Sequence, residues 1–153
     1  KNGFYYNHGA DNNLYLCKRL NAGLIFQKYN PKLFLFKKNI NLAKANSFFQ
    51  DNNGKRLSNL KIIKKSHQSN DFLKLNYFIA IKLAKEINFF KERNPFDKVF
   101  LDGIFAKNMI FIFFLKQLIK TEIFISTNSF INSVGASTFF YKKKINLNYT
   151  RIK

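Results

Sequence analysis

Apolar and polar positions change their spacing several times along the chain, and the clearest pattern lies between residues 97 and 126. A short β-rich run, DKVFLDG, precedes an almost continuous apolar stretch, and a second β-rich run, TEIFIS, follows it. This pattern predicts a strand, a crossover helix over residues 105–120 and a parallel strand, which pack together as a right-handed unit. Because the helix is apolar almost all round, we expect it to be buried on several sides.

A second and longer helix is predicted over residues 71–92. Asp71 suits the N-cap position, and the helix is expected to end before Asn94 and Pro95, since the residue before a proline is pushed out of the α region. Its apolar side chains recur at helical spacing: Phe72, Leu75, Phe78, Ile79, Leu83, Ile87 and Phe90.

Three short segments upstream of this helix are interpreted as strands. Residues 32–38 alternate large apolar side chains with lysine or leucine, and residues 43–50 form the second strand. Residues 56–63 return after a tight turn at residues 51–54, where Asn and Gly tolerate positive φ. With the later unit, these strands predict an α/β fold: a mixed five-stranded sheet with two main helices, in the order βββαβαβ, plus N- and C-terminal extensions.

One domain with extensions is expected for a chain of 153 residues. Residues 1–30 are interpreted as an irregular N-terminal extension that gains order against a partner. Residues 31–128 would form the α/β domain, and residues 129–153 a basic C-terminal tail that leaves it.

The charge of the chain narrows the range of possible functions. There are 27 Lys and Arg against 8 Asp and Glu, a formal net charge of +19. Such an excess destabilises a compact state by self-repulsion unless a polyanion neutralises it; nucleic acid is the first candidate and acidic lipid the second. The longest apolar run, residues 109–115, is far shorter than the roughly 20 residues of a membrane span. Because the charge is spread over loops and ends rather than over one helix face, RNA is favoured.

Few residues could hold a metal or a cofactor, and neither is expected. Cys17 is single, and His8 and His67 are far apart in sequence, so a disulfide framework and a cysteine-based zinc site are excluded. Phe, Lys, Asn and Ile, which dominate the composition, are the residues of A+T-rich codons. We therefore interpret the high content of 20 Phe residues as mutational drift rather than as twenty base-stacking residues. For Phe139, Phe140 and Tyr141, stacking on bases and packing against protein both stay open.

The order of predicted elements and several motif residues resemble the family of small ribosomal subunit protein eleven, over about residues 32–144. The Asp-x-x-Gly turn of that family matches Asp51 and Gly54, the glycine after its hydrophobic strand matches Gly103, and the glycine before its basic run matches Gly135. The resemblance implies a ribonuclease-H-like architecture. It also implies a structural role in the small ribosomal subunit, with ribosomal RNA bound in the platform near the mRNA exit region.

The resemblance and the A+T-rich composition together indicate a divergent mitochondrial copy, with another organelle as the alternative. The implied partners are small-subunit ribosomal RNA, neighbouring ribosomal proteins and mRNA near the exit site, without membrane insertion. A large-subunit protein of the protein-eighteen type is the nearest alternative, because its fold is similar. That family ends shortly after its last helix, whereas this chain continues over residues 121–153.

Basic side chains are the expected RNA-binding residues, and they fall into two groups. The first would line one edge of the sheet: Lys55, Arg56, Lys61, Lys64, Lys65 and Lys107. The second would thread between RNA helices as an extension: Lys142, Lys143, Lys144, Arg151 and Lys153. Contacts to phosphates position a protein without reading sequence, so specificity would come from RNA shape.

A metal-dependent nuclease of ribonuclease-H-like fold is the alternative from another functional class. Its candidate carboxylates are Asp51, Asp97 and Asp102. Catalysis by two metals needs several acidic groups that converge on one pocket, with the metals about 4 Å apart. Asp51 is explained by its turn and Asp97 by charge balance, and only Asp102 is expected at a strand end. No catalytic residue is assigned, and an enzyme is not expected.

Overall fold

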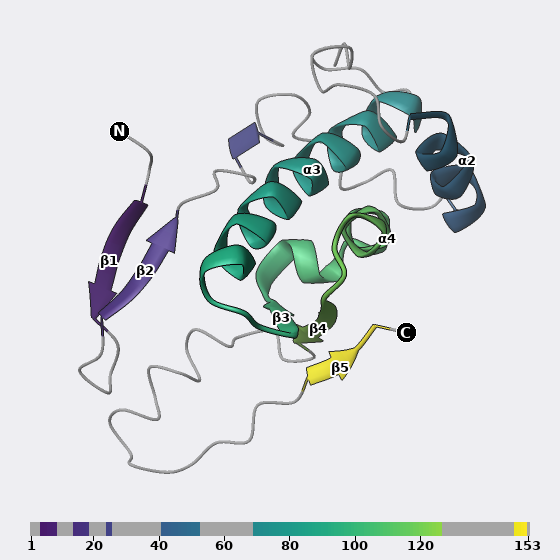
Figure 1. Cartoon of the computed structure of the whole chain (residues 1–153). Coiled ribbons are helices and arrows are strands. Elements are labelled where there is room, and N and C mark those ends of the chain that lie inside the picture. Colours follow the sequence, from purple (N-terminus) through teal and green to yellow (C-terminus); the bar gives the residue numbers. More distant parts are fainter. Residues whose placement is uncertain are drawn as a thin grey trace.

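The computed structural model describes the chain in several stretches: residues 4–8, 14–18, 24–25, 41–52, 69–126 and 149–152. The elements follow in this order (Figure 1): β1 (Phe4–His8), β2 (Leu14–Lys18), α2 (Leu42–Asn52), α3 (Ser69–Arg93), β3 (Lys98–Leu101), the 3-10 helix η3 (Gly103–Lys107), α4 (Met109–Leu118), β4 (Glu122–Ser126) and β5 (Tyr149–Arg151). We call residues 41–52, 69–126 and 149–152 the helix–sheet body.

The sheet of the helix–sheet body has the strand order β3-β4-β5. β3 runs parallel to β4, with Val99 opposite Ile123, and β4 runs antiparallel to β5, with Ile125 opposite Thr150. α3 packs along α4, and α2 contacts both helices (Figure 1). Since apolar side chains of the strands pack against the same core as the helices, the helices cover one face of the sheet.

The strand, crossover helix and parallel strand predicted between residues 97 and 126 are confirmed as β3, α4 and β4. The crossover helix is shorter than expected because η3 precedes it and Asn108 separates the two. Asn108 has an extended backbone, and its side chain accepts a hydrogen bond from the Phe111 amide at 3.2 Å, which makes it the N-cap of α4. The longer predicted helix is confirmed as α3, which ends just before Asn94 and Pro95. The predicted N-cap is wrong: α3 begins at Ser69, so Asp71 lies within its first turn.

The predicted five-stranded sheet is wrong: in the part of the chain that the structure describes, the sheet around β3 has three strands, and three helices accompany it. Residues 43–50, predicted as a strand, lie in α2. Asn41 Oδ1 accepts a hydrogen bond from the Lys44 amide at 2.9 Å and so caps this helix. The segment also lacks β-branched residues, and Ala45 and Phe49 recur at helical spacing toward the core.

Two of the predicted strands cannot be compared with the structure, and the predicted turn before the third is wrong. Residues 32–38 and 56–63 lie outside the described residues. Asp51, which the resemblance places in a hairpin turn, lies in the last turn of α2 instead. The third strand of the sheet is β5, which comes from the segment interpreted as a basic tail. β1 and β2 form a separate antiparallel pair within the segment interpreted as an irregular extension.

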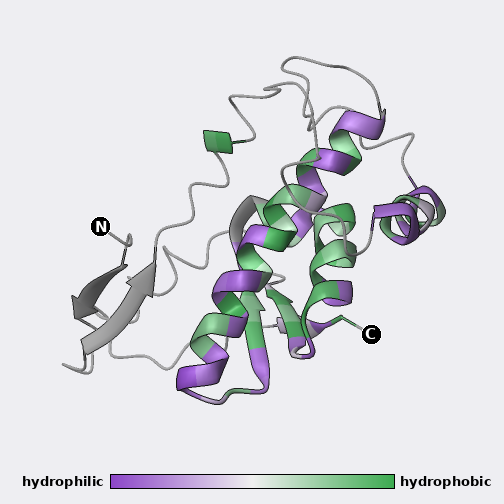
Figure 2. Ribbon diagram, turned by 45° about the horizontal axis from the view of Figure 1, so that its top comes forward, coloured by the Kyte–Doolittle hydropathy of each residue, from purple (hydrophilic) through white to green (hydrophobic). Residues whose placement is uncertain are grey.

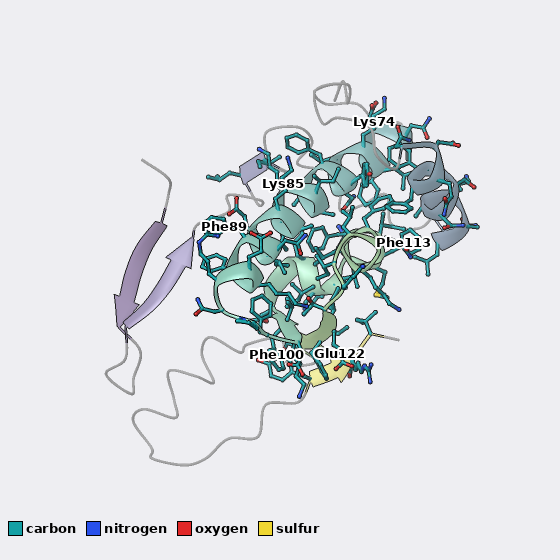
Figure 3. All side chains as sticks on the ribbon, in the orientation of Figure 1. Lys74, Lys85, Phe89, Phe100, Phe113 and Glu122 are labelled. Carbon is teal, nitrogen blue, oxygen red and sulfur yellow. The ribbon has the colours of Figure 1, made fainter. Side chains whose placement is uncertain are left out.

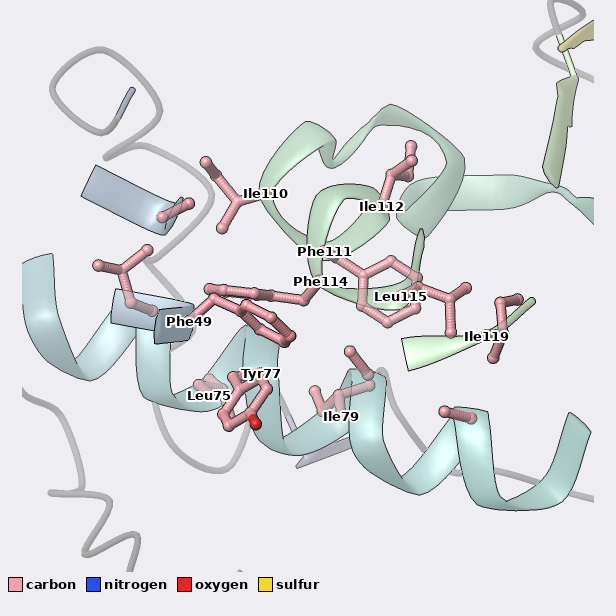
Figure 4. Close-up of a cluster of buried hydrophobic side chains, with 14 of the residues drawn as sticks. Phe49, Leu75, Tyr77, Ile79, Ile110, Phe111, Ile112, Phe114, Leu115 and Ile119 are labelled. Carbon is pink, nitrogen blue, oxygen red and sulfur yellow. The ribbon is translucent and has the colours of Figure 1, made fainter. Parts of the chain in front are cut away.

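Aromatic and aliphatic side chains from α2, α3 and α4 form the core (Figure 4). The Tyr77 ring lies 5.3 Å from the Phe114 ring and 5.9 Å from the rings of Phe48 and Phe49, measured between centroids. Phe114 and Leu115 are fully buried, as expected for a helix that is apolar almost all round. Figure 2 shows this contrast between the largely hydrophobic α4 and the amphipathic α3. Among the described helices, none is long and apolar enough to cross a membrane.

Two buried asparagines connect α3 to the start of α4. Asn108 Nδ2 donates to Asn76 Oδ1 at 2.7 Å, and Asn76 Nδ2 donates to the Phe72 carbonyl at 2.9 Å. The Tyr77 hydroxyl nearby donates to the Asn52 carbonyl at 3.3 Å, and burial raises the pKa of this phenol. Because a buried amide without a partner destabilises the fold, these bonds fix how α4 begins relative to α3.

Candidate nucleic-acid interface

Positive charge is divided unevenly between the helix–sheet body and the rest of the chain. The body contains eleven Lys and Arg and seven Asp and Glu, a net charge of +4. The other residues contain sixteen Lys and Arg and a single acid, Asp11, a net charge of +15. Most of the excess that indicates a polyanionic partner therefore belongs to segments outside the body.

Of the eleven expected RNA-binding residues, Lys107 and Arg151 lie in the described part of the chain. Lys107 ends η3 just before α4, whereas Arg151 lies in β5, which pairs with the strand that follows α4. A helix of this length spans about 15 Å, so the two cations lie near opposite ends of α4. The others lie outside the described residues: Lys55, Arg56, Lys61, Lys64, Lys65, Lys142, Lys143, Lys144 and Lys153.

Lys107 is exposed at the rim of a depression of about 240 Å³ between the starts of α2 and α4. The lining is largely apolar: Leu42 and Met109 contribute to it, and these side chains are 48% and 50% exposed. Asn108 also lines it, but the side chain of this residue already caps α4 and bonds Asn76. The depression therefore offers one cation beside apolar atoms, and we assign no ligand to it.

Arg151 forms an ion pair with Glu122 across β4 and β5. The Arg151 side chain is 60% exposed, so water screens the pair and its contribution to stability is about 0–1 kcal/mol. A phosphate could reach this guanidinium from solvent, but it would compete with the carboxylate of Glu122.

The exposed side of α3 has basic residues that are not among the eleven expected RNA-binding residues. The Lys82 ammonium lies 4.5 Å from the centroid of the Phe78 ring, and the Arg93 guanidinium lies 3.5 Å from that of Phe89. Lys85 is exposed between these pairs, and Figure 3 shows Lys85 and Phe89 on the side of α3 away from α4. Both pairs have the i, i+4 spacing that places two side chains together on a helix, and this spacing could have identified them.

The three carboxylates considered for a nuclease do not converge in the structure. Asp51 is exposed at the end of α2. Asp97 and Asp102 flank β3, one at each end, so about 16 Å of extended backbone separates them. Among the described residues there is no group of three His, Cys, Asp or Glu that could hold a metal ion.

Comparisons with known proteins find no match: no family model, no curated protein and no solved structure is similar enough to this chain. The resemblance to small ribosomal subunit protein eleven therefore stays a prediction.

Proposed function

We propose that this chain is a structural RNA-binding protein, a constituent of the small subunit of a mitochondrial ribosome, where it binds ribosomal RNA. The observation that carries this proposal is the uneven charge: +15 lies outside the helix–sheet body, against +4 within it. Cations spread along chain segments can neutralise many phosphates of an RNA backbone and release its counterions, which is a strong, sequence-independent source of affinity.

The packing of α3 favours RNA over an anionic membrane surface. A helix that lies on a membrane needs a free apolar face opposite its basic face. In α3 the residues opposite Lys82 and Lys85, such as Leu73, Ala80 and Ala84, are at most 5% exposed. This face already packs against α2 and α4, so α3 has no apolar side left for lipid.

In the second half of the chain, the order of helices and strands supports the proposal that this is a ribosomal protein. A long helix, a strand, a crossover helix and a parallel strand follow one another from α3 to β4, as in the family that the sequence resembles. The chain continues into β5, which favours the small-subunit family over the protein-eighteen type. The first half gives no such support, because α2 lies where the second strand was expected.

Sedimentation of a tagged chain with its native ribosomes tests the proposal. We expect the protein in the small-subunit fraction, and a chain found with the large subunit or free of both would contradict the assignment.

For purified protein and ribosomal RNA, the logarithm of the association constant should fall with the logarithm of salt concentration by about 0.7 to 0.9 per phosphate neutralised. Affinity that does not depend on salt would contradict RNA binding through phosphates.

A further inference from the structure

The two faces of the sheet β3-β4-β5 differ in chemistry. Residues opposite each other in the register point to the same face, and residues alternate along each strand. Val99, Leu101, Ile123 and Ile125 face the helices and pack against the core. The other face receives no aliphatic side chain from these strands: it has Lys98, Phe100, Glu122, Phe124, Ser126, Tyr149 and Arg151.

Three rings form a row across this second face, and we call Phe100, Phe124 and Tyr149 the aromatic row. Phe100 stacks on Phe124 with 5.3 Å between centroids and 27° between planes. Tyr149 meets the edge of Phe100 at 4.8 Å, although β4 separates their strands, so Tyr149 reaches across β4. Phe100 is 55% exposed, and Figure 3 shows it beside β5 at the side of the sheet away from α3.

We propose that the aromatic row is a stacking platform for the unpaired bases of single-stranded RNA; this inference rests on the proposed RNA-binding function. An aromatic ring on an open sheet face can stack on any base, because every base has a π-face. Lys98 is exposed on the same face two residues before Phe100, and Arg151 lies two residues after Tyr149. Lys98 is placed to contact the backbone between stacked bases, and Arg151 does so where a phosphate displaces the carboxylate of Glu122.

Charge favours RNA over a protein partner as the occupant. The whole chain has a net charge of +19, and three consecutive lysines, at 142 to 144, precede Tyr149 by only a few residues in the sequence. Aromatic rings also occur in protein interfaces, but a chain with this excess of lysine and arginine attracts a polyanion rather than an ordinary protein surface.

Affinity for unpaired RNA, measured with the full chain, separates stacking from general apolar contact. The variant Phe100→Leu/Tyr149→Leu keeps apolar bulk but loses two π-faces. We expect its affinity for a short oligouridine or oligoadenine strand to fall by about tenfold or more, while affinity for a hairpin duplex and the salt slope stay unchanged. The matched control is Phe113→Leu, at a half-buried ring of α4 outside the candidate interface, which should bind both RNAs as the unmodified chain does.

Tryptophan fluorescence provides a second measurement, which detects contact with bases directly and does not depend on a variant that binds RNA more weakly. The chain has no tryptophan, so Phe100→Trp introduces a single fluorophore into the aromatic row. Stacked bases should quench this fluorophore, whereas the fluorophore of Phe113→Trp should be unaffected by the same strand.

The outcomes distinguish this inference from the proposed function. If the unmodified chain binds RNA with a steep salt slope, but the double variant binds unpaired RNA equally well, the stacking platform is wrong and phosphate binding stands. The same holds if unpaired RNA leaves the Phe100→Trp fluorescence unchanged while a neighbouring ribosomal protein alters it, because the occupant is then a protein. If the unmodified chain binds neither RNA, both proposals fail.

Discussion

The helix–sheet body and the rest of the chain contain similar numbers of residues, but they differ in charge and in apolar packing. The body nearly balances its charges and buries aromatic side chains from three helices, with Tyr77 and Phe114 at the centre. The remaining residues contain sixteen of the 27 basic side chains and one acid. The stability of the body thus comes from apolar packing, and its low net charge limits the self-repulsion that a compact state must overcome.

The difference also shows why one chain can be strongly basic and still have a compact part. A charge of +19 spread evenly over a packed surface would place like charges within a Debye length of each other, about 10 Å at 0.1 M salt. Segregation avoids this for the body and leaves the basic residues outside it available for phosphates. The comparison predicts that core substitutions damage folding, whereas substitutions of lysines outside the body damage RNA binding.

Removal of a central ring should have the largest effect. Phe114 is fully buried and contacts the rings of Phe48, Tyr77 and Phe113, so Phe114→Ala leaves a cavity that three helices surround. We expect the free energy of unfolding to fall by about 3–5 kcal/mol in urea denaturation.

Met109→Ala, in the first turn of the same helix, is the matched control for this core substitution. The Met109 side chain is 50% exposed, so its truncation should cost less than about 1 kcal/mol. If the two variants lose equal stability, α4 is not the centre of the core.

Lysines in the two regions should contribute differently to RNA binding. Lys142→Gln/Lys143→Gln/Lys144→Gln removes three charges outside the helix–sheet body. We expect this variant to lower the salt slope for ribosomal RNA by about 2 units, since each phosphate contact contributes roughly 0.7 to 0.9.

A second triple variant tests whether location or total charge matters. Lys44→Gln/Lys116→Gln/Lys120→Gln removes the same charge from exposed positions in the body that lie outside the basic side of α3. Its salt slope should change by much less than that of the first triple variant. Equal slopes for both variants would mean that net charge alone determines binding, and that segregation has no role in it.

Sequence patterns could predict the elements whose periodicity is strong. α3 has a long helical repeat that ends at a proline, and the run from β3 to β4 has two β-rich segments around an apolar helix. The strand predicted over residues 43–50 has no such periodicity behind it: Ala45, Phe48 and Phe49 do not alternate, and their spacing fits the helix that forms. The cap at Asn41 and the lack of β-branched residues were the available evidence for a helix.

The candidate interface could be predicted only in part, because it depends on strand pairing. The basic composition indicated RNA, and Lys107 and Arg151 are indeed exposed. No local pattern in the sequence shows that Arg151 pairs with Glu122, or that Tyr149 meets Phe100 across β4. These contacts arise from the register of β5, a strand of three residues that lies far from β4 along the chain. Composition could not single out Phe100 and Phe124 from the other phenylalanines, because it does not show where a ring lies.

The smallest expected effect concerns the phenol of Tyr77, and it tests whether the core of the body excludes water. The Tyr77 hydroxyl donates to the Asn52 carbonyl, so at neutral pH Tyr77→Phe should lower the free energy of unfolding by about 0.5–1.5 kcal/mol. Burial raises the pKa of this phenol above its ordinary value of 10.0, so the folded state resists ionisation more than the unfolded state does. The advantage of Tyr77 over phenylalanine is therefore complete below the unfolded pKa and is lost as the pH rises through the folded pKa.

Urea denaturation of both chains from about pH 8 to about pH 11 measures this difference, because the contributions of all groups other than the phenol are common to both chains and cancel. We expect the stability of the unmodified chain to decrease relative to that of Tyr77→Phe above about pH 10. A stability difference that stays constant over the whole range would mean that the phenol is as well solvated in the folded chain as in the unfolded one. The ring cluster between α2, α3 and α4 would then be open to water, and the contrast between an apolar body and basic flanking residues would have to be abandoned.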